Sequence, residues 1–400
     1  MTNRLLDLGL LPLRVARRLS AQTAMRVLQR RQHPLVLMHG FMGFSRVGPF
    51  EYFVGVKEAL ELEGFRVHTP TVDPLNTFEY RAYEWVYGRP PDTDDIADAE
   101  RTFSPRDTLY RFLDHRFHPH LAQIYLDTRR PIHLVAHSQA AIDARFIASP
   151  DGLGSWRLFD SPQFDDDLRD LTVADCIASV TTIGGPHNGV LIADDTDLVN
   201  HFVESVLLPG IDRFISLFSH DASALYRAAR EFGRAYMLEE FNQSYADHDD
   251  VAYHSIAGVT NEYQVTMFLR PFYELTRYND RFEQDDNDGF VPVMSAKWPV
   301  QRVEDLPPTT TPTMHGFALD RPHPPATSGR WNFLGLVYAD HVNQIGFPLS
   351  YPRNHIFHHV HCYTGLARFL NGEMADGVRL QPNGIWHHGS ETTQETVKNP

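Results

Sequence analysis

The sequence predicts an α/β fold with a mainly parallel central sheet and helices on both of its faces. Apolar runs such as residues 34–38 do not alternate with polar residues, which is typical of strands buried on both faces of a parallel sheet. Residues 53–62 have helical spacing and lie between two such runs, so the strands are expected to be joined in right-handed βαβ units. The 400 residues are 42% hydrophobic and 22% charged, which suffices for a sizeable core.

The remaining elements follow from the same patterns. Residues 76–88 predict an aromatic-rich helix whose rings are interpreted as core rather than as a binding site. The proline- and acid-rich residues 89–107 indicate a surface insertion. Further strands are expected at 67–72, 132–137, 179–183 and 253–260, and further helices at 110–124, 140–147 and 354–370.

The domain organisation is predicted as one large domain with additions. Residues 33–375 form the domain, and the apolar helical patches of 197–250 are interpreted as a helical cap, or lid, inserted into it. Residues 376–400 read as a polar tail, and 1–32 as a basic, leucine-rich N-terminal extension. This extension is expected either to pack on the domain as a helix or to contact anionic lipid.

Charge and cysteine content exclude several classes of protein. The net charge of −15 argues against nucleic acid as a partner, and no apolar run approaches the ~20 residues that span a bilayer. Two cysteines, Cys176 and Cys362, cannot build a disulfide framework, so folding need not take place in an oxidising compartment. Residues 5–11 make a poor signal peptide, because Asp7 interrupts them and arginines follow.

The stretch 132–141 indicates a nucleophile elbow. A short apolar strand runs into a turn with Ser138 at its apex, and a helix follows. In such a turn the next residue, here Gln139, offers its backbone N–H to an oxyanion. Ala136 and Ala140 stand where glycines are usual, and they are the smallest substitutes. The alternative is an ordinary strand-to-helix connection in which Ser138 only caps the helix.

Two further features fit this interpretation. The strand at 34–38 ends in His39-Gly40-Phe41, and an H-G-apolar sequence in this place predicts that the Phe41 N–H is a second oxyanion donor. Ser138, an Asp near 288 and a His near 341 also stand in the order Ser…Asp…His, which is the order of the α/β-hydrolase fold.

The chain resembles the large lipases of thermophilic bacilli and staphylococci. The resemblance implies Ser138 as nucleophile, Asp288 as acid, His341 as base, and Phe41 and Gln139 as oxyanion donors. Asp285 and Asp286 remain rivals for the acid. The matching segments, in family order, are 36–41, 78–88, 133–140, 180–183, 186–189, 287–289, 329–332, 340–341 and 345–346.

No cofactor or metal is expected. The family's calcium ligands after the catalytic His are replaced by Asn343 and Pro348, and the Asp of its zinc site by Tyr80, with no histidine in 89–113. A second cluster is dense in potential zinc ligands, and two of its histidines are spaced i, i+4, but the glutamate of an HExxH motif is missing. A packed helix is therefore favoured for this cluster, which comprises His355, His358, His359, His361 and Cys362.

The sequence therefore predicts a serine carboxylester hydrolase of the lipase or esterase type. It would act on a small or lipid ester through an acyl-enzyme and contact a lipid interface through the cap. A polyester depolymerase or an acyltransferase on the same triad, a non-catalytic binding protein with this fold, and a metallohydrolase built on the C-terminal histidines remain alternatives. The family is mostly exported, so the resemblance and the N-terminus disagree on localisation, and the oligomeric state stays open.

Overall fold

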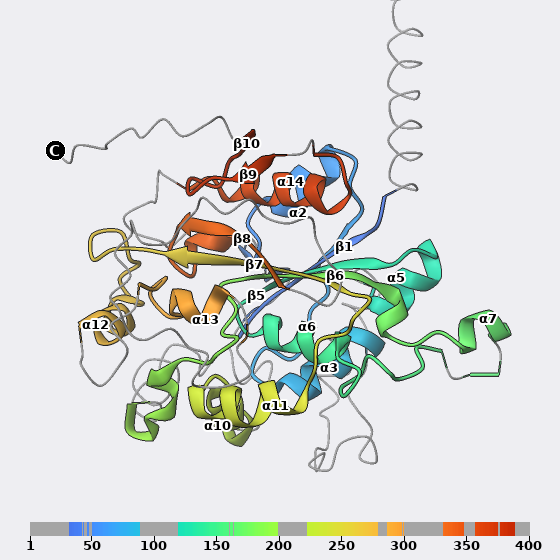
Figure 1. Cartoon of the computed structure of the whole chain (residues 1–400), viewed down its shortest axis with the longest axis horizontal. Coiled ribbons are helices and arrows are strands. Elements are labelled where there is room, and N and C mark those ends of the chain that lie inside the picture. Colours follow the sequence, from blue (N-terminus) through green and yellow to red (C-terminus); the bar gives the residue numbers. More distant parts are fainter. Residues whose placement is uncertain are drawn as a thin grey trace, which may run out of the picture.

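The structure is a computed structural model, and a parallel sheet crosses its middle (Figure 1). It describes residues 32–41, 43, 46–47, 50–88, 119–159, 161–162, 164–198, 222–278, 286–297, 299, 331–347, 357–374 and 377–388. Six strands pair in the order β4-β1-β5-β6-β7-β8, and every pairing is parallel. The strands are β1 (Leu35–Met38), β4 (Val67–His68), β5 (Ile132–His137), β6 (Ile177–Ile183), β7 (Ala252–Val259) and β8 (Trp331–Tyr338).

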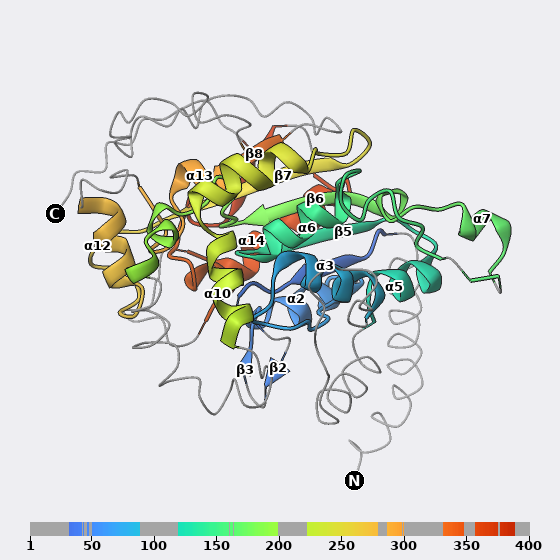
Figure 2. The same cartoon turned by 90° about the horizontal axis from the view of Figure 1, so that it is seen from below.

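Helices cover both faces of this sheet. α2 (Val56–Leu62) and α14 (His359–Leu370) pack together on one face. α3 (Phe78–Tyr87) and α6 (Ala140–Ala148) pack together on the other, with α5 (Leu121–Thr128) against α3 (Figure 2). The predicted α/β fold with a mainly parallel sheet and helices on both faces is therefore confirmed.

Shorter elements join these layers or extend them. On the α6 side lie α10 (Ala222–Glu231), the π-helical turn η4 (Tyr236–Phe241) and α11 (Asn242–Ser244). Two small antiparallel ribbons pair β2 (Arg46–Val47) with β3 (Phe50–Glu51), and β9 (Val378–Leu380) with β10 (Trp386–His388). The others are α7 (Asp166–Arg169), α12 (Arg270–Tyr278), α13 (Val293–Lys297) and the 3₁₀ turns η1 (Ala174–Cys176), η2 (Leu191–Asp194) and η6 (Asn343–Ile345).

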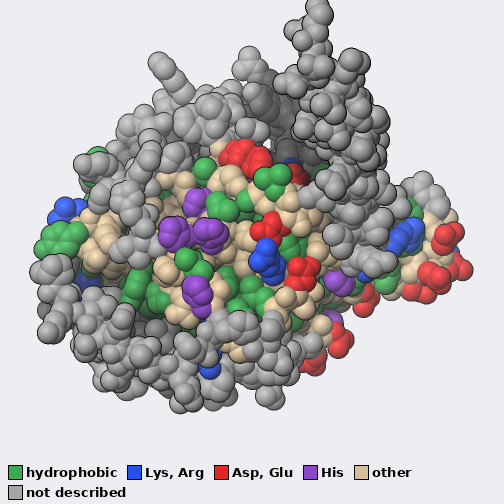
Figure 3. All heavy atoms as spheres, turned by 90° about the horizontal axis from the view of Figure 1, so that it is seen from above, with side chains coloured by type: hydrophobic (Ala, Val, Ile, Leu, Met, Phe, Trp, Pro, Cys, Tyr) green, Lys and Arg blue, Asp and Glu red, His purple; other side chains and the backbone are tan. Residues whose placement is uncertain are grey.

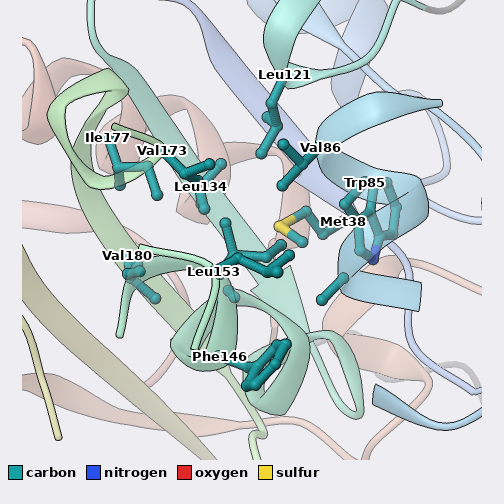
Figure 4. Close-up of a cluster of buried hydrophobic side chains, with 14 of the residues drawn as sticks. Met38, Trp85, Val86, Leu121, Leu134, Phe146, Leu153, Val173, Ile177 and Val180 are labelled. Carbon is teal, nitrogen blue, oxygen red and sulfur yellow. The ribbon is translucent and has the colours of Figure 1, made fainter. Parts of the chain in front are cut away.

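Each face of the sheet has its own hydrophobic core. Met38 and Leu134 point from the strands toward Trp85 of α3 and Phe146 of α6 (Figure 4). Leu35, Leu37 and Val135 point the other way, toward α2 and α14. Because successive side chains of a strand point to opposite faces, two buried faces require strands that are apolar throughout. This explains the non-alternating runs in the sequence.

Several sequence-based boundaries need correction. β4 ends at His68 instead of continuing to residue 72, because Pro70 has no N–H for the ladder. The strand β8 was not predicted, although its eight residues are largely apolar. The last helix begins at His359 instead of residue 354, since Phe357 and His358 are not helical.

The predicted polar tail also needs correction. Its residues 377–388 form the β9–β10 ribbon, which packs on the domain: Leu380 is buried, and the Trp386 ring stacks on Phe369 of α14. Residues 1–31, 89–107, 110–118, 199–221 and 389–400 of the predicted extension, insertion, helix, cap and tail lie outside the described residues.

Cys176 and Cys362 are both free and buried. Burial raises the pKa of each thiol to about 12, so neither is a thiolate at neutral pH. Among the described residues, no helix is both long enough and apolar enough to span a bilayer.

Candidate active site

Ser138 occupies a strained turn between β5 and α6. Its φ angle is 59°, in the left-handed region, which costs a non-glycine residue about 1–2 kcal/mol. Its N–H donates to Ile183 O at 3.1 Å, which ties the turn to the end of β6. Ala136 and Ala140 are fully buried on either side of the turn. This is the elbow geometry that the sequence predicts.

Three of the predicted side chains lie within hydrogen-bonding distance. His341 Nδ1 is 2.7 Å from Asp288 Oδ2, and His341 Nε2 is 2.9 Å from Ser138 Oγ. An ionised carboxylate only accepts hydrogen bonds, so Nδ1 carries the proton and Nε2 is free to accept the serine hydroxyl. The Ser138 hydroxyl is therefore hydrogen-bonded to the imidazole and does not cap α6, which was the alternative interpretation of this turn. Among described residues, the α6 N-terminus has no side-chain cap.

All three side chains follow the carboxyl ends of sheet strands, where ligands of parallel sheets bind. Ser138 follows β5, Asp288 lies in the connection after β7, and His341 follows β8. Asp288 has no exposed surface, whereas Ser138 and His341 keep 7% and 8% of theirs. A substrate can therefore approach the hydroxyl and the imidazole but not the carboxylate.

The Asp288 carboxylate accepts hydrogen bonds on both oxygens. Oδ1 receives the backbone N–H groups of Phe290 at 3.0 Å and Val291 at 2.7 Å. Oδ2 receives Gln344 Nε2 at 2.8 Å in addition to His341. These donors fix the orientation of the carboxylate.

The neighbouring acidic residues point elsewhere. Asp286, a rival from the sequence, pairs with Arg277 at 2.9 Å, and Asp285 lies outside the described residues. Asp340, which immediately precedes His341, accepts the Thr266 N–H and hydroxyl at 2.7 and 2.6 Å. Of the described carboxylates, Asp288 is therefore the one bonded to the imidazole.

Gly40 brings the end of β1 against the serine. A Cβ added at Gly40 would stand 2.6 Å from Ser138 Cβ, so only glycine allows this approach. Its N–H donates to Tyr52 Oη at 3.0 Å, and its carbonyl accepts from Gly43 N at 3.0 Å. Within the described part of the chain, the N–H groups of Phe41 and Gln139 have no hydrogen-bond acceptor. These N–H groups belong to the residues that follow Gly40 and Ser138, so they remain the candidates for an oxyanion hole.

Arg81, on α3, joins residues 39–41, which follow β1 and are called the β1 loop below, to α6. Its fully buried guanidinium donates to Asp143 Oδ2 on α6 at 2.8 Å and to the His39 carbonyl at 2.7 Å. A third bond reaches the Asp73 carbonyl at 2.8 Å. Even with Arg81 beside it, burial raises the pKa of Asp143 to about 6. The Arg81–Asp143 pair thus fixes the position of the β1 loop relative to α6.

A second buried chain of hydrogen bonds runs behind the imidazole. His137 Nε2 lies 3.0 Å from the His341 carbonyl, which only accepts, so Nε2 carries the proton. Burial lowers the pKa of His137 well below its ordinary value, so the ring is neutral and its Nδ1 must accept. The Tyr52 hydroxyl, 2.8 Å away, therefore donates to Nδ1 while it accepts the Gly40 N–H. This series of hydrogen bonds links the β1 loop to the His341 backbone.

Sequence reasoning missed these supporting residues. Arg81 lies in a segment that matches the lipase family, and His137 directly precedes the serine, so both gave a weak signal. Tyr52 and Gln344 gave none, because their roles depend on contacts between distant segments.

The C-terminal histidines do not converge as a zinc site in the described part of the chain. His359 Nε2 lies 2.9 Å from the Val54 carbonyl, to which it donates, so this atom faces the domain. The rings of His358 and His361 are 5.6 Å apart and exposed. Figure 3 shows histidine side chains gathered on the face that carries α14. His355, the other member of the expected i, i+4 pair, lies outside the described residues, and α14 begins at His359.

Aromatic rings lie between the β1 loop and His341. The half-buried Phe41 ring meets Phe232 edge to face at 5.6 Å, and Phe232 lies 6.5 Å from Phe290. The Phe290 ring is 5.6 Å from the His341 ring, and the Phe272 ring is 5.7 Å from the Phe290 ring, edge to face. The reactive groups thus have an apolar, aromatic neighbourhood.

The parallel sheet, the serine elbow after β5 and the later Asp and His define an α/β-hydrolase fold. Lipase 1 from Pelosinus fermentans superposes with a TM-score of 0.56 at 19% identity, over 85% of this chain and 99% of that one. Staphylococcus hyicus lipase does so with a TM-score of 0.53 at 15% identity, over 85% and 97%. The predicted resemblance to staphylococcal lipases is confirmed at the level of fold.

Sequence comparison points to the same group of proteins. The chain is 24% identical over 287 residues to a triacylglycerol lipase of Pseudomonas fragi, covering 65% of this chain and 80% of that protein. It is 23% identical over 163 residues to a triacylglycerol lipase of Vibrio cholerae, covering 41% of this chain and 35% of that protein. No protein-family model matches the chain.

Proposed function

We propose that this protein is a serine carboxylester hydrolase of the lipase or esterase type. The observation that carries the proposal is the hydrogen-bonded line from Ser138 Oγ through His341 to Asp288, with bonds of 2.9 and 2.7 Å. The similarity to triacylglycerol lipases, in sequence and in fold, supports ester hydrolysis as the chemistry.

In the proposed mechanism, Ser138 Oγ attacks the ester carbonyl carbon as its proton passes to His341 Nε2. The neutral Nε2 is already aligned to accept this proton, and buried Asp288 stabilises the imidazolium that forms. The negative charge that develops on the carbonyl oxygen is received by the N–H groups of Phe41 and Gln139. Removing one such donor in a comparable enzyme costs about 3–4 kcal/mol of transition-state stabilisation.

Collapse of the tetrahedral intermediate breaks the bond to the alcohol, which leaves with the proton from His341. The acyl group then remains on Ser138 as an ester. Water attacks this ester with His341 again as base, and the acid leaves as Ser138 recovers its proton.

The aromatic rings beside the site favour an apolar acyl group. Phe41 is half-buried in an edge-to-face contact with Phe232, and Phe290 faces the His341 ring. An acyl chain in this neighbourhood would remove apolar surface from water at about 25 cal/mol per Å². Esters with several methylenes in the acyl chain should therefore be turned over with a higher kcat/KM than acetates.

The test compares Ser138→Ala with Ser155→Ala, which removes the hydroxyl of an exposed serine outside the site. Hydrolysis of p-nitrophenyl esters by Ser138→Ala should fall by roughly 10⁴- to 10⁶-fold, because the nucleophile is gone. Ser155→Ala should retain wild-type rates, and both variants should keep the wild-type circular dichroism spectrum. Turnover retained by folded Ser138→Ala would refute the assignment.

A further inference from the structure

A buried glutamine touches the acid of the proposed triad from the side opposite its backbone donors. Gln344 lies in the 3₁₀ turn η6, three positions after His341, and none of its surface is exposed. Its Nε2 donates to Asp288 Oδ2 at 2.8 Å. Because a carboxylate only accepts, the amide nitrogen must be the atom that faces it. The same Oδ2 also receives His341 Nδ1, so the glutamine and the imidazole share one oxygen.

Two glycines on neighbouring strands make the space for this amide. A Cβ added at Gly258, on β7, would stand 2.0 Å from Gln344 Nε2. A Cβ added at Gly184, after β6, would stand 2.5 Å from Gln344 Oε1 and 3.1 Å from Asp288 Oδ2. Gly184 also has a φ of 58°, which side chains rarely adopt. The amide is thus held in a slot that fixes its position against the carboxylate.

We infer that Gln344 is a positioning residue that sets both the orientation and the effective charge of Asp288. A donor on Oδ2 draws charge away from the oxygen that holds the imidazole. Removing this donor should therefore strengthen the attraction of the carboxylate for a protonated imidazole. This inference rests on the proposed function.

Apart from His341, the other titratable groups at this site do not bond to Asp288 Oδ2. The neutral His137 ring lies 4.7 Å from the His341 ring and bonds to the His341 carbonyl and to Tyr52. The Asp340 carboxylate is occupied by Thr266 and by the Val342 and Asn343 N–H groups. Among the described side chains, Gln344 and His341 are thus the ones bonded to Asp288 Oδ2.

The experiment measures kcat/KM for a p-nitrophenyl ester against pH in wild type, Gln344→Met and Gln344→Glu. Methionine keeps the volume but donates nothing, so the midpoint of the acidic limb should rise by about 0.5 pH unit and kcat should fall about tenfold, with KM within threefold. Glutamate adds a negative charge beside Asp288 and should raise the midpoint further. Gln123→Met, which breaks an exposed 2.8 Å bond to Asp127, is the matched control and should change nothing.

Each result of this experiment either supports or overturns the positioning role of Gln344. Folded Gln344→Met and Gln344→Glu with the wild-type midpoint would overturn the inference, even if both lose stability, because a purely structural residue would not move it. If Gln344→Met does not fold, Gln344→Asn, which shortens the amide by one methylene, should give the same direction of shift, and an unchanged midpoint there would overturn it too. Wild type is measured first: a wild type without esterase activity would refute the proposed function itself.

Discussion

Replacing Arg81 tests whether this residue contributes only to the stability of the domain or also to the placement of the oxyanion amides. In Arg81→Met the buried guanidinium is lost, and Asp143 keeps only Trp85 Nε1, 2.9 Å away, as a donor to Oδ2. Removing one partner of a buried ion pair costs about 3–5 kcal/mol, since it leaves an uncompensated buried charge. The carbonyls of His39 and Asp73 also lose charge-assisted donors.

The double variant Arg81→Met/Asp143→Asn removes the uncompensated charge of Asp143 but does not restore a hydrogen-bond donor to the His39 carbonyl. Asparagine keeps an acceptor for Trp85 Nε1, so roughly 2–3 kcal/mol of the free energy of unfolding should return. The His39 carbonyl still has no donor, so the β1 loop that carries Phe41 is less firmly placed. We therefore expect kcat about 10- to 100-fold below wild type in both variants, less than the roughly 10²- to 10³-fold loss on removing an oxyanion donor outright, because the Phe41 N–H is displaced and not deleted.

The assay combines urea unfolding with initial rates on p-nitrophenyl butyrate, normalised to folded protein. Arg270→Met, which breaks the exposed Arg270–Glu274 pair, is the control and should change neither quantity measurably. If the double variant recovers wild-type kcat together with its stability, Arg81 acts only through stability and the reasoning is refuted.

Two further predictions concern Tyr52 and His133. Tyr52→Phe removes the hydroxyl between Gly40 N and His137 Nδ1, so urea unfolding should show a loss of about 1–3 kcal/mol and steady-state rates a roughly tenfold lower kcat. Unchanged kinetics would contradict this role. Burial, with smaller effects of His33 and His254, lowers the pKa of His133 to about 3, so it contributes stability above pH 6.5 that is lost on acidification. Between pH 6 and 4, His133→Gln should flatten the pH dependence of the unfolding free energy by about 1.4 kcal/mol per unit, and an equal slope would contradict it.

Local patterns predicted the fold well where residues act on their neighbours. A non-alternating apolar run identified β1, because a strand buried on both faces has no polar side. Short apolar or β-branched stretches identified β5, β6 and β7. The strand β8 was not predicted, because Asn332 and Gly335, which are residue types depleted in strands, interrupt its apolar run. The β9–β10 ribbon was missed because its residues are mostly polar, and its burial depends on the α14 surface.

The residues of the candidate site also fall into two groups: those that the local sequence predicts and those that only tertiary contacts reveal. Ser138 and Phe41 have local signatures, in the elbow and the H-G-apolar turn, whereas Asp288 and His341 were selected by chain order and family resemblance. The buried partners Tyr52 and Gln344 could not be predicted, since each meets its target only when distant strands come together. Tertiary packing, not local propensity, creates such positions.

The most direct test of the account is the site of covalent labelling by a fluorophosphonate probe. Phosphonylation needs an activated hydroxyl, so wild type should carry one probe on the peptide that contains Ser138, as read by mass spectrometry after proteolysis. His341→Ala, in which the hydroxyl keeps no base, should label at least 100-fold more slowly. A folded wild type that stays unlabelled, or is labelled on another serine, would contradict the account.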